Sequence, residues 1–167
     1  KKHVACSGKL TPMSVRQTEP GKRKRYSPQE AYPRICRYCA YQERSHKEVR
    51  TKLFSYGLFP SQVEEMLARL ITDGFLNEER FAKSFARGKF NIKKWGKNRI
   101  VNELKYRNIS KYNITAALKE IDPQEYLNTL DTLAIKRLGQ ISESNIQKRR
   151  KKLADYLLYR GWESALV

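Results

Sequence analysis

The chain has 167 residues, of which 40% are hydrophobic and 31% are charged, and its formal net charge is +18. This length suits one ordinary domain or a short array of small units. The charge favours a polyanionic partner, which would be a nucleic acid, an anionic membrane surface or an acidic protein. No run of 18 apolar residues occurs, so the sequence predicts no transmembrane span.

The start of the sequence lacks the charged segment and apolar stretch of a secretory signal. Three cysteines in a chain without such a signal suggest a reducing compartment. We therefore expect a cytoplasmic, monomeric protein that has no membrane partner.

Residues 1–26 are predicted to form a disordered basic tail. The segment carries eight Lys or Arg residues against the single acidic residue Glu19, and it contains Pro and Gly but no apolar period. The run Lys22-Arg23-Lys24-Arg25 could contact a polyanion, or it could serve only to keep the chain soluble. The sequence leaves both possibilities open.

A first helical unit is predicted over residues 27–74. Its helices should begin at capping boxes, in which a Ser and a Glu three residues later cap each other's backbone N–H groups. The boxes start at Ser27, Ser45 and Ser61. Pro33 lies inside the first helix and predicts a kink or a delayed start there. The expected buried residues of this helix are Ile35, Cys36, Cys39 and Ala40.

Two further units are predicted over residues 75–121 and 122–167. The second should begin at Asn77 and its first helix should end just before the Trp95-Gly96 turn. The third should begin at Asp122 and be incomplete, because the sequence stops before a third helix can form. The expected inner face of its first helix is Tyr126, Leu127, Leu130, Leu133, Ala134 and Leu138.

The three units repeat one pattern. Their apolar positions align after shifts of 51 and 53 residues, and the aligned turn positions are Gly57, Asn108 and Gly161. Gly and Asn most readily adopt the left-handed conformation that ends a helix. No segment alternates with period two. We predict an all-α fold of three tandem three-helix, helix-turn-helix-like repeats. They should form an elongated curved array, with a truncated last repeat and a core shared between neighbours.

Positive charge is concentrated in two strips. Residues 87–107 carry eight basic residues against Glu103, with aromatic residues between them, and residues 148–152 are all basic. Such a mixture favours phosphate contact and base stacking, although a basic surface can also be merely solvated. The predicted polyanion-binding or DNA-binding residues, centred on Trp95, are Lys93, Lys94, Trp95, Lys97, Arg99, Lys105, Arg107, Lys148, Arg149, Arg150, Lys151 and Lys152.

No catalytic constellation is found. The sequence has no phosphate-binding loop, dinucleotide fingerprint, HExxH or GxSxG. Cys36 and Cys39 have CxxC spacing, but one pair cannot fill a tetrahedral zinc site, and such residues on a helix are more often core. His46 lies in a capping box without partners for a general base. We therefore expect no enzymatic activity, no cofactor and no metal.

Several stretches, in order, are similar to one known family. They are residues 37–53, residues 73–82, Trp95-Gly96-Lys97 with Ile100, Glu103, Leu104 and Ile109, and the third unit from Asp122 onward. Their order, spacing and threefold recurrence over residues 27–162 resemble RecX, a regulator of the bacterial recombinase RecA. Asn108 and Gln42 depart from the family's usual Gly and Arg, and the basic extension before Ser27 is long.

The resemblance implies a non-enzymatic modulator that lies along the groove of the RecA filament on single- or double-stranded DNA. It would block filament growth or promote disassembly, and so reduce ATP hydrolysis and strand exchange. Two other functions remain open on the charge and unit shape alone. One is a stand-alone helix-turn-helix DNA-binding protein, and the other is a helical protein–protein scaffold.

Overall fold

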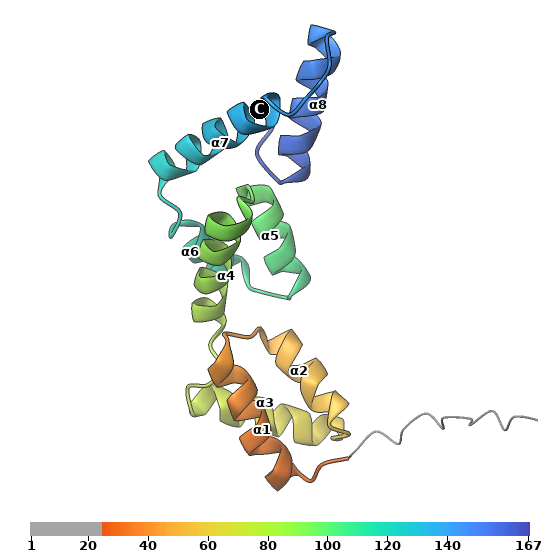
Figure 1. The fold of residues 1–167 in the computed structure, drawn as a ribbon. Helices are drawn as coiled ribbons and strands as arrows, with labels where there is room; N and C mark the ends of the chain where they lie inside the picture. Colours follow the sequence, from red (N-terminus) through yellow and green to blue (C-terminus); the bar gives the residue numbers. More distant parts are fainter. Residues whose placement is uncertain (1–24) are drawn as a thin grey trace, which may run out of the picture.

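The computed structural model describes residues 25–167, and all regular secondary structure in that range is α-helical (Figure 1). Residues 1–24 of the predicted basic tail lie outside the described range. The helices are α1 (Pro28–Tyr41), α2 (His46–Ser55), α3 (Pro60–Thr72), α4 (Glu78–Lys93), α5 (Lys97–Tyr106), α6 (Lys111–Leu118), α7 (Pro123–Leu138) and α8 (Ile146–Tyr159).

The helices form three groups that follow one another along an elongated molecule (Figure 1). Repeat 1 is α1–α3, repeat 2 is α4–α6, and repeat 3 is α7 and α8 with the turns that follow them. Repeat 3 therefore has two helices where the others have three. The all-α fold and its shortened last repeat are confirmed.

Most helices begin where the sequence predicted. Both Ser27 and Ser45 form reciprocal capping boxes, and the side chains of Asn77 and Asp122 cap α4 and α7. The box at Ser61 is wrong, because α3 begins one residue earlier, at a proline. There the Gln62 side chain accepts a hydrogen bond from the N–H of Phe59 at 3.0 Å.

Three expectations within helices are corrected. α1 starts at Pro28 and runs through Pro33, so the start is not delayed. Ala40 is exposed, whereas Cys39 is buried and Cys36 packs beside it against the core of repeat 1. In α7, Leu127 and Leu138 lie outside the core, 42% and 37% exposed, and do not face the cluster around Tyr126 and Leu130.

The repeated turn is confirmed at all three positions. Gly57, Asn108 and Gly161 have φ angles of 82°, 60° and 87°. After α5 and α8 the following residue donates its N–H back to the last turn, from Ile109 to Leu104 at 3.1 Å and from Trp162 to Leu157 at 3.2 Å. This hydrogen-bonded ending satisfies backbone carbonyls that would otherwise have no partner at the end of the helix.

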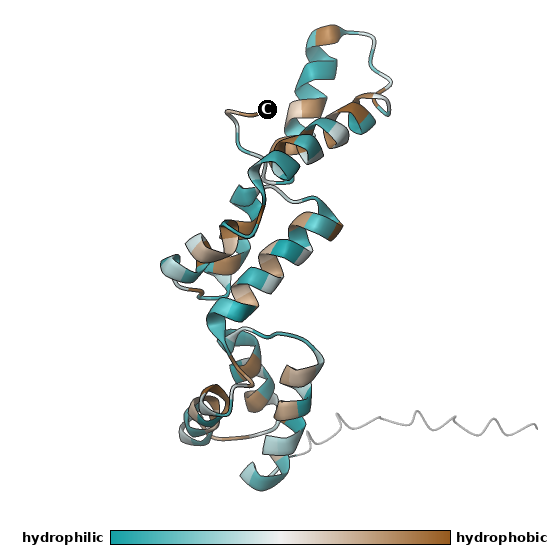
Figure 2. Ribbon diagram, turned by 90° about the vertical axis from the view of Figure 1, so that its left-hand side faces the viewer, coloured by the Kyte–Doolittle hydropathy of each residue, from teal (hydrophilic) through white to brown (hydrophobic). Residues whose placement is uncertain are grey.

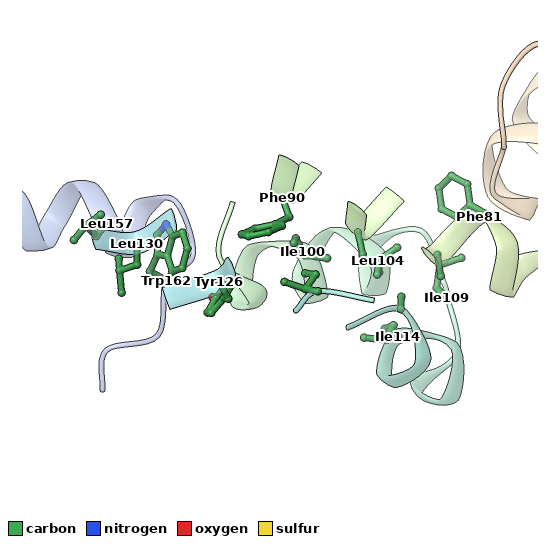
Figure 3. Close-up of a cluster of buried hydrophobic side chains, with 14 residues drawn as sticks. Phe81, Phe90, Ile100, Leu104, Ile109, Ile114, Tyr126, Leu130, Leu157 and Trp162 are labelled. Carbon is green, nitrogen blue, oxygen red and sulfur yellow. The ribbon is translucent and has the colours of Figure 1, made fainter. Parts of the chain in front are cut away.

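The expectation of a shared core holds for only one of the two junctions. Hydrophobic and hydrophilic residues alternate along the helices in the hydropathy colouring (Figure 2). Repeats 2 and 3 bury their apolar sides in one continuous cluster, which runs from Phe81 through Ile100 and Tyr126 to Leu157 (Figure 3). Repeat 1 has a separate cluster around Ile35. Among residues 25–167, no buried apolar cluster draws side chains from both repeats 1 and 2.

Repeats 1 and 2 are instead linked by polar contacts. The Arg80 guanidinium donates to the Glu43 carboxylate at 2.5 Å, and the Lys47 ammonium donates to the backbone carbonyl of Tyr106 at 2.8 Å. Both bonds are exposed to solvent, so each stabilises the junction only modestly. The molecule is therefore two packed bodies: repeat 1, and repeats 2 and 3 together.

Two glycines bring repeats 2 and 3 into backbone contact. The N–H of Gly96 donates to the Arg160 carbonyl and that of Asn98 donates to the Gly161 carbonyl, each at 3.0 Å. A Cβ on Gly96 would lie 2.2 Å from the Gly161 oxygen, and one on Gly161 would lie 2.3 Å from the Arg99 Cβ. The start of α5 can approach the end of α8 only because both positions lack a side chain.

The substitution Gly161→Ala is expected to lower the free energy of unfolding by about 1–3 kcal/mol, because it adds backbone strain at positive φ and a steric clash. Gly88→Ala is the matched control. It lies inside α4 with nothing within 4 Å of a new Cβ, so it should raise stability by about 0.5–1 kcal/mol. Urea unfolding of both variants measures the difference. Equal stability of the two would contradict the backbone contact.

Candidate nucleic-acid interface

A basic cavity of about 530 Å³ lies at the junction of repeats 2 and 3. Six cationic side chains and three aromatic side chains line it, together with two aliphatic residues and an amide, and no carboxylate. The lining residues are Ile92, Lys93, Lys94, Trp95, Arg99, Leu133, Lys136, Arg137, Gln140, Tyr156, Tyr159 and Arg160. They come from the end of α4, the start of α5, the last turns of α7 and the end of α8.

Local backbone geometry at the end of α4 sets one wall of the cavity. Lys94 has φ of 53° and ends the helix in the left-handed conformation. The N–H of Trp95 then donates to the Lys89 carbonyl at 3.3 Å. This turn leaves Lys93, Lys94 and Trp95 on the cavity wall just before α5 begins.

Arg99 joins two aromatic rings of the cavity. Its guanidinium carbon lies 4.2 Å from the centre of the Trp95 ring and 5.1 Å from that of Tyr159. It also donates to the backbone carbonyl of Tyr159 at 3.2 Å. A guanidinium held between rings has little freedom left to lose, so it is preorganised for a planar or anionic ligand.

On the α7–α8 side of the cavity, the Tyr156 ring contacts two guanidinium groups. The guanidinium carbons of Arg137 and Arg160 lie 4.8 and 4.9 Å from its ring centre. Arg160 also donates to the Lys93 carbonyl at 2.5 Å, which connects α8 to the end of α4. Three of the six cations, the arginines, are thus held against rings of the cavity, and none of the six is in an ion pair within residues 25–167. Such a cluster favours an anionic ligand.

Tyr126 stabilises the junction beneath the cavity. Its hydroxyl accepts the N–H of Lys97 at 2.9 Å and donates to the Glu163 carboxylate at 2.5 Å. Its ring packs against Trp162 with centroids 4.4 Å apart. Burial, together with the hydrogen bond to Glu163, raises the pKa of Tyr126 above its ordinary value, so the phenol stays protonated.

The structure brings together four of the twelve predicted binding residues and separates the rest. Lys93, Lys94, Trp95 and Arg99 line the cavity. Lys97 lies with its ammonium 4.4 Å from the Tyr126 ring centre, outside the cavity lining. The remaining predicted residues lie elsewhere, namely Lys105, Arg107, Lys148, Arg149, Arg150, Lys151 and Lys152.

The strip at residues 148–152 lies on the first turns of α8, whereas the cavity uses its end. Eleven residues of helix separate Lys148 from Tyr159, about 16 Å along the axis. Within the strip, Lys152 is paired with Glu143 at 2.8 Å and Arg149 donates to the Leu138 carbonyl. Arg107 is paired with Glu103 at 2.5 Å, near repeat 1.

Sequence reasoning missed the cavity residues from repeat 3. Those with charged or aromatic side chains are Lys136, Arg137, Tyr156, Tyr159 and Arg160. A signal was present, because Lys136 and Arg137 end α7 with two adjacent cations and Arg160 directly precedes the Gly161 turn. Their relation to Trp95 depends on the contact between Gly96 and Gly161, which no local pattern specifies.

Two other features bear on the chemistry. Within residues 25–167, no group of three or more His, Cys, Asp or Glu side chains is placed to hold a metal ion. In the same part of the chain, no helix combines the length and apolar character needed to cross a membrane.

Comparison with known proteins gives the family. The profiles of the first, second and third three-helix domains of RecX match residues 31–70, 77–118 and 124–167. Together they cover most of the chain, in the order of the repeats. The chain belongs to the RecX family. Its relatives include the regulatory protein RecX of Prosthecochloris aestuarii, 30% identical over 139 residues, which are 83% of this chain and 89% of that protein.

Other RecX relatives are longer. The regulatory protein RecX of Oceanobacillus iheyensis is 26% identical over 83% of this chain, and that of Bacillus cytotoxicus is 23% identical over the same share. The chain spans about half the length of these two relatives, 51% and 52%.

Solved RecX structures share the fold. The crystal structure of RecX from Lactobacillus salivarius superposes with a TM-score of 0.73 at 24% identity, over 83% of this chain and 90% of that one. A second crystal structure of a regulatory protein RecX gives a TM-score of 0.76 at 24% identity, over 83% of this chain and 68% of that one. The chain therefore shares its overall fold with these two structures.

Proposed function

We propose that this chain is a non-enzymatic, cytoplasmic modulator that acts as a monomer on the filament a RecA recombinase forms on DNA. Bound along the filament, it inhibits filament growth, ATP hydrolysis and strand exchange. Membership of the RecX family supports the regulatory role. The observation that carries the binding mode is the basic cavity, where six cations and three aromatic rings converge without a carboxylate.

The cavity suits nucleic-acid phosphates and bases at the same time. Lys and Arg side chains neutralise phosphates and release condensed counterions, and exposed rings stack on unpaired bases. Because the cavity walls come from both repeats 2 and 3, the shared core of these repeats fixes its shape. An acidic surface of the recombinase could meet the same cations where they are not covered by DNA.

The test measures ATP hydrolysis by a RecA recombinase on single-stranded DNA with increasing amounts of this chain. We expect inhibition at micromolar concentration, together with binding to the assembled filament. Neither inhibition nor filament binding at that concentration would contradict the proposal. Sequence-preferring binding to duplex DNA without recombinase would favour a stand-alone helix-turn-helix protein instead. A scaffold would be favoured if reversing the charges of Lys97, Arg99, Lys105 and Arg107 left every binding activity intact.

A further inference from the structure

A second hollow lies where repeat 1 meets repeat 2, between α2 and the end of α5. Its volume is about 450 Å³, and it shares no lining residue with the basic cavity. We call it the junction groove, and its lining includes Tyr38, Lys47, Lys52, Tyr106 and Arg107. Because repeats 1 and 2 have separate cores, no buried apolar cluster of the described residues fills this space.

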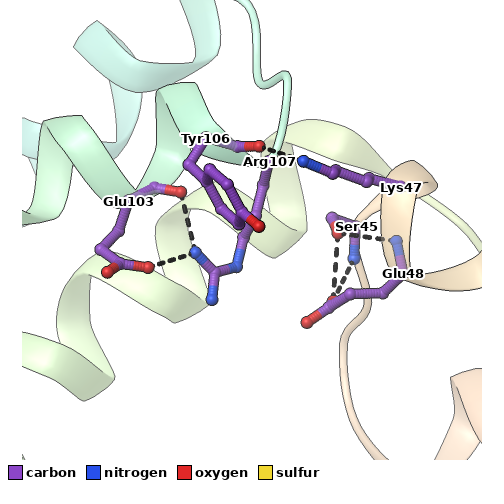
Figure 4. A network of polar contacts seen from close by, with 6 residues as sticks. All are labelled: Ser45, Lys47, Glu48, Glu103, Tyr106 and Arg107. Carbon is purple, nitrogen blue, oxygen red and sulfur yellow. Dashed lines mark hydrogen bonds and ion pairs between the residues drawn. The ribbon is translucent and has the colours of Figure 1, made fainter.

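An exposed aromatic ring forms one wall of the junction groove. Tyr106 is 70% exposed, and its ring stands out beside Arg107 at the end of α5 (Figure 4). The Lys47 ammonium reaches across from α2, 3.9 Å from the ring centre, and donates to the Tyr106 carbonyl at 2.8 Å. On the repeat 1 side, the half-buried Tyr38 ring has the Lys52 ammonium 5.8 Å from its centre. The groove thus has rings flanked by two cations.

The carboxylates around the groove do not neutralise these two lysines. Glu48 is the carboxylate on its lining, and one of its oxygens accepts both the N–H and the hydroxyl of Ser45 in the cap of α2. Arg107 is held by Glu103 through its carboxylate and its carbonyl. Neither Lys47 nor Lys52 forms an ion pair within residues 25–167.

We propose that the junction groove binds one or two unpaired bases of a single-stranded nucleic acid. A base stacks on the face of the Tyr106 ring opposite the Lys47 ammonium, and Lys47 and Lys52 neutralise the flanking phosphates. Stacking requires an open base face, which a duplex hides inside its own stack, so the groove should distinguish single from double strands. The volume falls in the range that encloses small ligands rather than a duplex.

A strand held in the groove would also join the two bodies of the molecule. Tyr106 and Arg107 belong to repeat 2, whereas Tyr38, Lys47 and Lys52 belong to repeat 1. This site rests on the proposed function because it takes nucleic acid as the class of ligand. All of its residues lie at the junction of repeats 1 and 2, so it is separate from the basic cavity.

The test measures binding of the full chain to a fluorescent oligothymidylate and to a duplex by anisotropy, without recombinase. Tyr106→Leu should weaken oligothymidylate binding by about 5- to 150-fold, because one base loses its aromatic partner. Tyr106→Phe keeps the ring and should bind as the unmodified chain does. Tyr112→Leu is the matched control, since Tyr112 is 78% exposed on α6 and outside the groove. Duplex affinity should be unchanged in all three variants.

Two results would overturn the groove. The first is that the Tyr106→Leu variant binds oligothymidylate as tightly as the Tyr112→Leu variant does. The second is that Tyr106→Leu loses as much affinity for the duplex, or for poly-glutamate as a polyanion without bases, as it loses for oligothymidylate. The recombinase assay separates this from the proposed function. Inhibition of ATP hydrolysis without a Tyr106 effect on strand binding overturns the groove alone. Tyr106-dependent strand binding without inhibition overturns the proposed function alone and supports the groove.

Discussion

Trp162→Ala is expected to destabilise repeats 2 and 3 by about 3–5 kcal/mol while repeat 1 stays folded. Trp162 is 1% exposed and packs against Tyr126 in the core that the two repeats share. Removing the indole leaves a cavity at the point where the repeats meet. The core of repeat 1 includes no residue beyond Leu76, so it should not feel the loss.

Hydrogen exchange is the measurement, because it reports stability helix by helix. In the Trp162→Ala variant the amides of α4, α5 and α7 should lose protection, and those of α1–α3 should keep it. Leu158→Ala is the control from the same helix. Leu158 is 44% exposed, so its truncation should cost within about 1 kcal/mol. Equal loss of protection in α1–α3 would contradict the two-body architecture.

Neutralising three lysines of the basic cavity is expected to weaken single-stranded DNA binding by about a hundredfold at 0.15 M salt. The variant is Lys93→Gln, Lys94→Asn and Lys136→Gln. Asn is chosen at position 94 because that residue has φ of 53°, which Asn tolerates. On a single strand each lost phosphate contact removes about 0.7 of a counterion from the salt dependence, so the slope of log affinity against log salt should fall in magnitude by about two.

The matched control carries the same charge change on the first turns of α8. It is Lys148→Gln, Arg150→Gln and Lys151→Gln, at exposed positions away from the cavity. Affinity titrations between 50 and 200 mM salt compare the two variants. We expect a smaller loss from the control, because its cations lack the converging rings. A larger loss from the control would move the binding face to the 148–152 strip.

Much of the fold could be predicted because its signals are local. A cap involves residues three apart, and a turn needs one Gly or Asn, so Ser27, Asn77 and Asn108 could be placed from the sequence. The prediction of a capping box at Ser61 was wrong because two local signals compete there, and the helix begins at the adjacent Pro60. Threefold recurrence then gave the number of repeats.

The site could be predicted only where it is contiguous in sequence. Lys93, Lys94 and Trp95 are neighbours in the chain and also in the cavity. Their partners on α7 and α8 arrive through the backbone contact of Gly96 with Gly161, 65 residues away. Charge density marked residues 148–152 but could not show which end of α8 faces repeat 2. The unequal junctions were also hidden, because apolar periodicity does not tell whether neighbouring cores merge.

Crosslinking on an assembled recombinase filament tests whether the basic cavity is the face that binds the filament. A photoreactive amino acid is placed at Trp95, in the basic cavity, and in a second variant at Ile146, which is 59% exposed at the far end of α8. We expect crosslinks from position 95 to the DNA or the recombinase of the filament, with few from position 146. Crosslinks from position 146 with none from position 95 would contradict this expectation.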